Sequence, residues 1–178
     1  MPKRWTIDSS HSAAGFSVRH MMIANVIGLF GKMTGTIYFD PPHIASLSVE
    51  AEIEVGSITT GYPTRDEHLL SADFFDAANH PKINFKSTKV ESLGGVRGRI
   101  TGDLTMRGKT QPLTLEFEYF GPVKSPFGGE ITIGFAATGK INREDYEISW
   151  NETMPEGGVV VDKEVKITLG VEADLITE

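Results

Sequence analysis

The chain has 178 residues, a length that suits one domain, and an all-β domain of this size needs no second unit. The hydrophobic fraction of 39% and the charged fraction of 23% exclude disordered and collagen-like classes, and the absence of cysteine excludes disulfides, thiolate metal sites and cysteine nucleophiles. A net charge of -7, without any cluster of Lys and Arg among aromatic residues, disfavours binding to nucleic acid or to an anionic membrane surface.

The amino terminus leads directly into a strand-like stretch, Trp5-Thr6-Ile7-Asp8. No apolar segment with a cleavage site precedes this stretch, as an export signal would require, and no run of about 18 apolar residues follows. We therefore expect a cytoplasmic protein without a transmembrane segment, or a periplasmic one if an export signal has been removed.

Apolar and polar residues alternate in the first third of the chain, which is the pattern of strands with one buried face. We expect strands at 5–8, 14–19, 29–39 and 47–55, with a short irregular or helical piece at 20–25. The alternation over 47–55 is almost without error, so this strand is expected to have one wet and one buried face.

A short helix is predicted after the 47–55 strand. The chain is interrupted by Gly61-Tyr62-Pro63, and Thr64 and Glu67 have the spacing of a capping box, so the helix should begin at Arg65. Ser71 is placed to cap a second turn. A later proline returns the backbone to an extended conformation.

The second half of the chain reads as strands joined by tight turns. The pair Gly94-Gly95 is a hairpin signal, because glycine tolerates the positive φ of such turns. The chain is expected to reverse again at 107–109 and to form a longer loop at 121–129. The predicted inward rows are Val96, Gly98, Ile100, Gly102 and Leu104; Leu113, Leu115, Phe117 and Tyr119; Ile131, Ile133, Phe135 and Ala137; and Val165, Ile167, Leu169, Val171 and Ala173.

About eight antiparallel strands in sequence close most simply into an up-and-down barrel, which has no unpaired edge and room for one small ligand. Glycine within a strand weakens pairing unless bending or close approach requires it, and barrel curvature would explain Gly98, Gly102 and Gly134. We therefore predict a single all-β domain over 1–178, an eight-stranded antiparallel up-and-down barrel with short helices at one end. A β-sandwich is the alternative.

The segment behind the 47–55 strand contains a motif that comprises Ser57 to Thr60, Gly61, Arg65-Asp66, His68-Leu69 and Asp73-Phe74-Phe75-Asp76. This motif resembles the signature of YceI-like proteins. Matching blocks in the same order cover nearly the whole chain: Trp5 to Asp8, His11-Ser12, Phe16 to Met21, Gly28 to Phe30, Pro81 to Ser87, Gly102 to Gly108, Ile141 to Tyr146 and Ile148 to Trp150. The resemblance implies a lipocalin-like barrel that holds a long polyisoprenoid lipid, and a possible homodimer. Glu147 stands where the family pattern implies glycine, which puts the local turn in doubt.

This resemblance, together with the inward rows, predicts a site for a polyisoprenoid or quinone-like amphiphilic lipid without a catalytic residue, metal or cofactor. Each phenylalanine taken alone has the alternative role of core packing. The predicted ligand-binding residues are Phe16, His20, Phe30, Phe39, Ile53, Arg65, His68, Leu69, Phe74, Phe75, Phe85, Phe135, Arg143 and Trp150.

The polar residues of the motif blocks leave several roles open. Asp66 can pair with an arginine or orient a histidine and so hold loops at the barrel mouth. Arg65 or Arg143, with a histidine, can instead meet a polar head group such as a diphosphate. A weaker alternative is a metal site formed by the following residues: His11, His20, His68 and Asp66.

Catalysis is the competing class of function. His20, His68 or Asp66 could act as acid or base on a small hydrophobic substrate in the same pocket. The closeness of Asp8, His11 and Ser12 in the chain is weak evidence for a hydrolase triad, which is defined by three-dimensional roles. A ligand-free stress or interaction protein is the third class.

Overall fold

A computed structural model describes residues 1–178, and almost all of the regular structure is β-strand. No helix in it has the length and apolar character needed to span a bilayer. The strands are β1 (Arg4–Ile7), β2 (Ala13–His20), β3 (Ala24–Phe30), β4 (Met33–Asp40), β5 (His43–Glu54), β6 (Ile58–Thr59), β7 (Lys82–Gly94), β8 (Arg97–Met106), β9 (Lys109–Lys124), β10 (Ile131–Asn142) and β11 (Val161–Leu175). The helices are α1 (Pro63–Leu70) and the short 3-10 helices η1 (Ser9–His11), η2 (Val55–Ser57) and η3 (Arg143–Tyr146).

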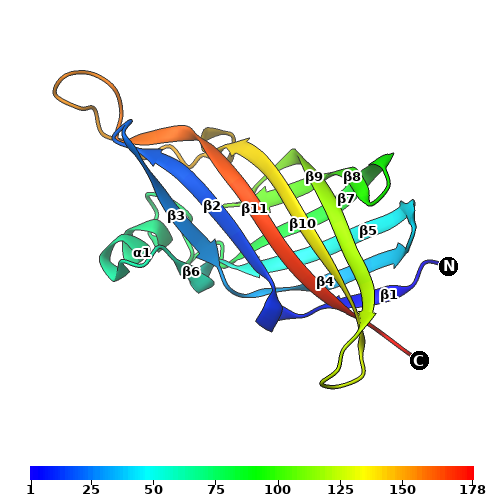
Figure 1. Cartoon of the computed structure of the whole chain (residues 1–178). Helices are drawn as coiled ribbons and strands as arrows, with labels where there is room; N and C mark the ends of the chain where they lie inside the picture. The colour runs from blue at the N-terminus through cyan, green and yellow to red at the C-terminus, as the bar shows by residue number, and fades with distance from the viewer.

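Eight strands form a closed antiparallel ring in the order β1-β4-β5-β7-β8-β9-β10-β11, which β1 closes by pairing with β11 (Figure 1). The remaining strands continue members of the ring. Because β1 and β2 pair with successive parts of β11, they form one line that η1 interrupts. In the same way β3 precedes β4, and β6 follows β5. The closed ring confirms the predicted barrel and excludes the sandwich.

Three strand boundaries differ from the sequence prediction. The expected irregular piece at 20–25 is a hairpin turn between β2 and β3, and the expected strand at 29–39 is interrupted between β3 and β4. Strand β9 continues to Lys124, so the loop expected at 121–129 begins later. Ile131 is 40% exposed because the register of β10 against β9 shifts between Thr132 and Gly134, and a shift of one residue turns a side chain to the other face.

Helix α1 begins differently from the prediction. It starts at Pro63, and Tyr62 occupies the N-cap position without a side-chain hydrogen bond, so the predicted capping box does not form. Proline suits the first helical turn, where a backbone N–H has no partner within the helix. Ser71 ends the helix, and its Oγ accepts a hydrogen bond from the Asp73 amide at 3.3 Å in a turn that does not extend into a second helix.

Two of the predicted strand glycines lie beneath aromatic rings. A Cβ on Gly102 would meet the ring of Phe85, and a Cβ on Gly98 would meet the ring of Phe117. Close approach of a ring, and not only the expected barrel curvature, therefore explains these two glycines. Gly134 has more room, since its nearest neighbours lie 3.8 Å or more from such a Cβ.

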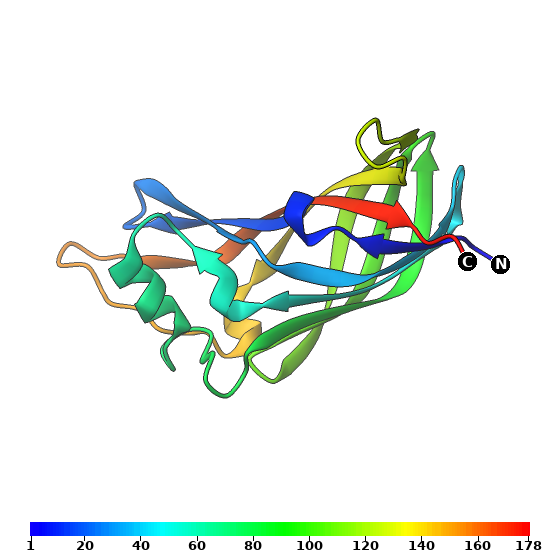
Figure 2. The same ribbon diagram turned by 90° about the horizontal axis from the view of Figure 1, so that it is seen from below.

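The end of the barrel that carries the chain termini is filled with side chains, whereas α1 lies at the opposite end (Figures 1 and 2). Trp5, Phe39, Ile133 and Ala173 are almost fully buried. The indole Nε1 of Trp5 donates a hydrogen bond of 2.9 Å to the Phe39 carbonyl, and the ring of Tyr119 packs edge-on against Phe39 at 5.0 Å between centroids. This solid end closes one side of the barrel interior.

Candidate ligand-binding site

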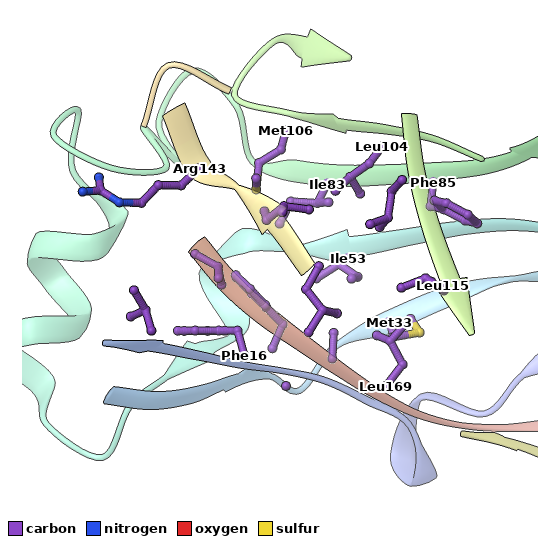
Figure 3. Close-up of a pocket in the computed structure, with 18 of the residues that line it drawn as sticks. Phe16, Met33, Ile53, Ile83, Phe85, Leu104, Met106, Leu115, Arg143 and Leu169 are labelled. Carbon is purple, nitrogen blue, oxygen red and sulfur yellow. The ribbon is translucent and has the colours of Figure 1, made fainter. Parts of the chain in front are cut away.

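The interior between the solid end and α1 contains a cavity of about 400 Å³, in the size range of about 300–1,000 Å³ that is usual for small-molecule sites. It is lined by 40 residues, of which 34 are hydrophobic. Figure 3 shows wall residues from opposite sides of the ring pointing toward one another, among them Phe16, Ile53, Phe85 and Leu169. The cavity is therefore closed at one end and has an almost wholly apolar wall.

The wall is long because single strands contribute several residues to it. On β11, Val165, Ile167, Leu169 and Val171 all line the cavity, since alternate residues of a strand point to the same face. At about 3.3 Å per residue, Val165 to Val171 extend over roughly 20 Å. This length suits a chain-like ligand better than a compact one.

The structure places thirteen of the fourteen predicted ligand-binding residues on this wall, and their contact with a ligand stays a prediction. The exception is Phe39, whose side chain is fully buried outside the wall. Its ring packs against Tyr119 and Phe135 and belongs to the solid end of the barrel. The thirteen are Phe16, His20, Phe30, Ile53, Arg65, His68, Leu69, Phe74, Phe75, Phe85, Phe135, Arg143 and Trp150.

The site prediction omitted most of the aliphatic wall. Met33, Ile83, Leu104, Met106 and Leu115 line the cavity and are labelled in Figure 3. All of them follow the same alternation as the predicted phenylalanines. The signal was present in the sequence, but alternation alone does not separate a cavity wall from a packed core.

An aromatic cluster narrows the cavity at the end that carries α1. The ring of His68 lies edge-on to Phe74 and Trp150, with centroids 5.1 and 4.9 Å away. The Nε2 atom of His68 lies 2.9 Å from Oδ2 of Asp73, a hydrogen bond that fixes the imidazole. Helix α1 and the turn that follows it therefore position the aromatic side chains at this end of the cavity.

Every polar side chain on the wall is basic. The wall contains three arginines and two histidines and no Asp, Glu, Ser, Thr or Tyr; the five are Arg19, His20, Arg65, His68 and Arg143. The chain as a whole has 24 acidic and 17 basic residues, so the sign of the charge on the wall is opposite to that of the whole chain. The mouth therefore favours a negatively charged group.

Arg65 and Asp66 connect α1 to the end of β6. Arg65 donates from Nε to Thr60 Oγ1 and from Nη2 to the Thr60 carbonyl, both at 2.7 Å. Asp66 Oδ1 accepts from the Thr60 amide at 2.9 Å and from its hydroxyl at 2.6 Å. Asp66 thus has a structural role in holding the helix, while Arg65 both ties the helix and faces the cavity.

Arg143 is the most buried cation of the site, with 4% of its surface exposed. Its guanidinium donates four hydrogen bonds of 2.7 to 3.0 Å to the main-chain carbonyls of Ile148, Trp150, Val161 and Asp162. Burial lowers the pKa of Arg143 from its usual value. Arg143 holds the loop between η3 and β11 and places a positive charge beside the apolar wall, with Glu144 and Asp162 as acidic neighbours.

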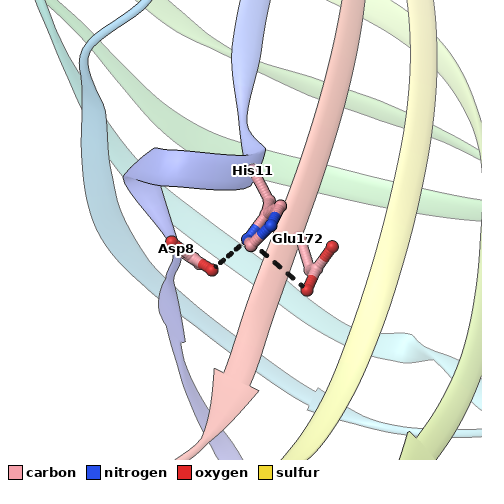
Figure 4. A group of neighbouring side chains, drawn as sticks. All are labelled: Asp8, His11 and Glu172. Atoms are coloured by element: carbon pink, nitrogen blue, oxygen red, sulfur yellow. Dashed lines mark hydrogen bonds and ion pairs between the residues drawn. The ribbon is translucent and has the colours of Figure 1, made fainter. Parts of the chain in front are cut away.

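A separate polar cluster lies outside the cavity, where η1 meets β11 (Figure 4). His11 Nδ1 is 2.6 Å from Asp8 Oδ2 and 4.0 Å from Glu172 Oε1. The hydrogen bond with Asp8, followed by the charge of Glu172, raises the pKa of His11, and the bond to His11 lowers the pKa of Asp8. The cluster braces the junction of β1 and β2.

The structure forms neither a triad of Asp8, His11 and Ser12 nor the alternative metal set. The Ser12 hydroxyl donates to the Glu172 carbonyl at 3.3 Å, so it does not face His11. The alternative metal set fails because His11 lies in the Asp8 and Glu172 cluster, whereas His20 and His68 line the cavity. Asp8 and His11 are in contact, but Ser12 does not join them, and His20 and His68 lie apart from that cluster.

Comparison with known proteins identifies relatives over almost the full length. A family model described as the YceI-like domain matches residues 5–173. A UPF0312 protein of Staphylococcus aureus strain N315 is 34% identical over 168 residues, which cover 94% of this chain and 95% of the relative.

Solved structures share the architecture. A Campylobacter jejuni YCEI protein has a TM-score of 0.75 at 31% identity over 90% of each chain. Burkholderia cenocepacia BcnA has a TM-score of 0.80 at 24% identity and covers 93% of this chain and 98% of its own. A polyisoprenoid binding domain from Saccharophagus degradans has a TM-score of 0.69 at 13% identity, covering 99% and 100%, and like BcnA it shows the fold alone. On the family match and the identity to its relatives, this chain belongs to the YceI-like domain family.

Proposed function

We propose that the protein binds a polyisoprenoid or quinone-like amphiphilic lipid and carries or stores it without catalysing a reaction. One observation supports this most directly: the cavity wall is long and apolar, and all of its ionisable side chains are arginine or histidine. A hydrocarbon tail matches the cavity, and an acidic head group matches the mouth. The description of the Saccharophagus degradans domain as polyisoprenoid binding is consistent with this ligand class.

The apolar wall favours a long tail. Each buried methylene contributes about 0.8 kcal/mol, whereas association costs about 4–15 kcal/mol, so a tail must bury about five to twenty carbons before binding becomes favourable. Apolar walls discriminate weakly between similar hydrocarbons. Length and head group therefore decide the selectivity, and related lipids compete for the site.

The head group is expected to be an anion such as a phosphate or diphosphate. Arg19 is exposed at the mouth, and the planar guanidinium suits oxygen acceptors. Arg143 has four donors committed to carbonyls, so it acts mainly through its charge. The wall offers no carboxylate or hydroxyl for acid, base or nucleophilic chemistry.

The bound molecule is testable by native mass spectrometry of protein purified without detergent. We expect a co-purifying species of prenyl mass series in the wild type. Phe85→Arg places an unpaired charge in the wall and should abolish retention. The matched control is Phe127→Arg, which makes the same change at a side chain that is 98% exposed, and it should keep the lipid. Retention by both variants contradicts the proposal.

The role of the basic mouth in binding an anionic head group can be tested without a substitution in the apolar wall. Arg19→Glu alters an exposed residue and should weaken binding of an isoprenyl diphosphate more strongly than binding of the corresponding isoprenyl alcohol. An equal loss of affinity for the two ligands would contradict the role assigned to the basic mouth.

A homodimer also stays a proposal, and light scattering on the eluted protein measures the mass that tests it.

A further inference from the structure

The cavity ends at the same level on several strands of the ring. On each of these strands the last residue of the wall is followed, two positions nearer the solid end, by a buried residue that the cavity does not reach. Alternate residues of a strand share a face, so both members of each pair point inward. The pairs are Ile7 and Trp5 on β1, Ile37 and Phe39 on β4, Phe117 and Tyr119 on β9, Phe135 and Ile133 on β10, and Val171 and Ala173 on β11.

Three aromatic residues at this level, Phe39, Tyr119 and Phe135, form what we call the floor cluster. The ring of Phe39 lies 5.0 Å from that of Tyr119 and 5.8 Å from that of Phe135, measured between centroids. The Phe39 amide donates to the Lys3 carbonyl at 2.9 Å, and its carbonyl accepts from the Trp5 indole at 2.9 Å. The floor cluster is therefore held by main-chain hydrogen bonds as well as by ring packing, and a ligand that displaces it breaks contacts that a hydrocarbon cannot replace.

The wall above the floor cluster includes small side chains. Ala14, Ala51 and Ala137 all line the cavity. Ala14 and Ala137 are the partners of Leu169 on the two sides of β11, so they lie at one level of the ring. A methyl group leaves room for a tail to pass, whereas the aromatic rings below it fill the interior. The change from alanine to aromatic residues therefore marks where a tail must stop.

The strand that carries Phe135 also leads to a fixed group at the other end of the cavity. Arg143 follows β10 directly, and four carbonyls hold its guanidinium in place. Figure 3 shows Arg143 on the side of the cavity that faces α1, away from Leu115. At about 3.4 Å per residue, the chain from Phe135 to Arg143 extends over roughly 27 Å. One strand thus sets the spacing between the floor cluster and the basic end of the wall.

We propose that the floor cluster limits the length of the hydrocarbon tail that the cavity accepts, and that Phe135 is the residue that sets the limit. The identity of the cargo rests on the proposed function, whereas the limit applies to any chain-like amphiphile whose head group stays at the mouth. A tail below the limit gains affinity with each methylene that it buries. A longer tail either leaves its last methylenes in water or overpacks the floor cluster, and both reduce its affinity.

The test offers the delipidated full-length protein an equimolar mixture of n-alkyl phosphates of increasing length and measures the bound masses by native mass spectrometry. Occupancy of the wild type should rise by about fourfold for each methylene up to a limiting length and then stop rising. Phe135→Ala removes the ring that faces the tail, so a chain two methylenes beyond the wild-type limit should gain about tenfold relative to a chain at that limit. Ala137→Leu fills a position above the floor cluster and should move the limit to shorter chains. A general loss of stability cannot produce shifts in opposite directions.

The matched control is Phe16→Ala, which truncates another phenylalanine of the wall nearer the mouth. Phe16 is the partner of Ile167 on β11, whereas Phe135 is the partner of Val171, closer to the solid end. Phe16→Ala should weaken binding of long and short chains alike and leave the limit where it is in the wild type. A limit that moves as far in Phe16→Ala as in Phe135→Ala overturns the inference.

The remaining outcomes separate the length limit from the proposed function. If the wild type, Phe135→Ala and Ala137→Leu share one limit, or if none has a limit, the inference is wrong even when isoprenoid binding is intact. If the wild type shows a limit that shifts as expected in the two variants but neither co-purifies with an isoprenoid nor binds one, the proposed function is wrong and the role of the floor cluster stands.

Discussion

At Glu147 the backbone adopts a left-handed conformation, with φ of 58°, at the end of η3. Glutamate replaces the expected glycine, but the backbone keeps the left-handed conformation that glycine would adopt. The turn is therefore intact, although the Glu147 backbone is strained. The Glu147 carboxylate lies 3.3 Å from Lys109 Nζ, in an exposed ion pair of the kind that contributes little to stability.

Glu147→Gly is therefore expected to raise the free energy of unfolding by roughly 0.5–1 kcal/mol, because glycine adopts positive φ without a steric penalty. Urea denaturation measures the gain as a higher midpoint. Glu147→Ala removes the carboxylate but keeps the Cβ, so it should bring no such gain. Equal stabilisation by both substitutions would show that strain at this residue is not the cause.

His11 makes the stability of the fold depend on pH. The pKa of His11 is raised, mainly by its hydrogen bond with Asp8, so its stabilising contribution is complete below its ordinary pKa of 6.5 and is lost as pH rises through the raised pKa. The pKa of Asp8 is lowered from 3.8, so its contribution is present above that value and is lost as pH falls through the lowered pKa.

We expect the urea midpoint of the wild type to fall as pH rises above about 6.5, and that of His11→Gln to change less over the same range. An NMR titration of the His11 ring should show a raised pKa in the wild type and a value nearer the ordinary one in Asp8→Asn. If the two titration curves coincide, Asp8 does not control the imidazole.

Among the strands, β8 shows how close packing of an element shapes the cavity. Gly102 lies beneath the Phe85 ring, with the Lys86 carbonyl oxygen 2.6 Å from where a Cβ would stand. Added bulk must move either the ring or the paired strand, because both sides of the position are occupied. Strand β11 offers a contrast at Gly170, where a Cβ would meet nothing within 4 Å.

Gly102→Ala should lower the free energy of unfolding by about 1–3 kcal/mol, the usual cost of overpacking a well-filled position. Gly170→Ala should be neutral or stabilising by about 0.4–1 kcal/mol, because it restricts the unfolded chain without a clash. Denaturation of the two variants with matched lipid content tests the contrast. If Gly102→Ala lowers the free energy of unfolding less than Gly170→Ala does, the Phe85 ring can move aside without an energetic cost.

Considered as a whole molecule, the barrel is hollow at one end and solid at the other, so the proposed function predicts that its stability depends on a bound lipid. A ligand that binds only the folded state adds RT ln(1 + [L]/Kd), which is about 2.7 kcal/mol at a hundredfold excess over Kd. Removing the lipid on a hydrophobic resin should therefore lower the melting temperature, and adding an isoprenyl phosphate should restore it. An unchanged melting temperature would indicate that the cavity does not hold the ligand.

Much of this architecture was predictable because strand geometry is local. The rows from Leu113 to Tyr119 and from Val165 to Ala173 alternate in the sequence and face inward in the structure. The hairpin turn at Gly94 was also predictable, because glycine readily adopts the positive φ that the backbone has there. The prediction failed at Ile131, since a register shift depends on the partner strand, and at Thr64, since Pro63 determines where α1 starts.

The sequence by itself determined most of the inward-facing rows, because the pleat of a strand sets that direction residue by residue, and of the predicted rows only Val96 and Ile131 are exposed. Only the tertiary structure decided whether an inward side chain fills the barrel or lines a space: Phe39 packs into the solid end, while Phe135 reaches the cavity wall. It also decided that Arg143 binds carbonyls and that His11 meets Glu172 from the far end of the chain. These outcomes depend on the taper of the ring and on side chains that opposite strands contribute, which no local pattern specifies.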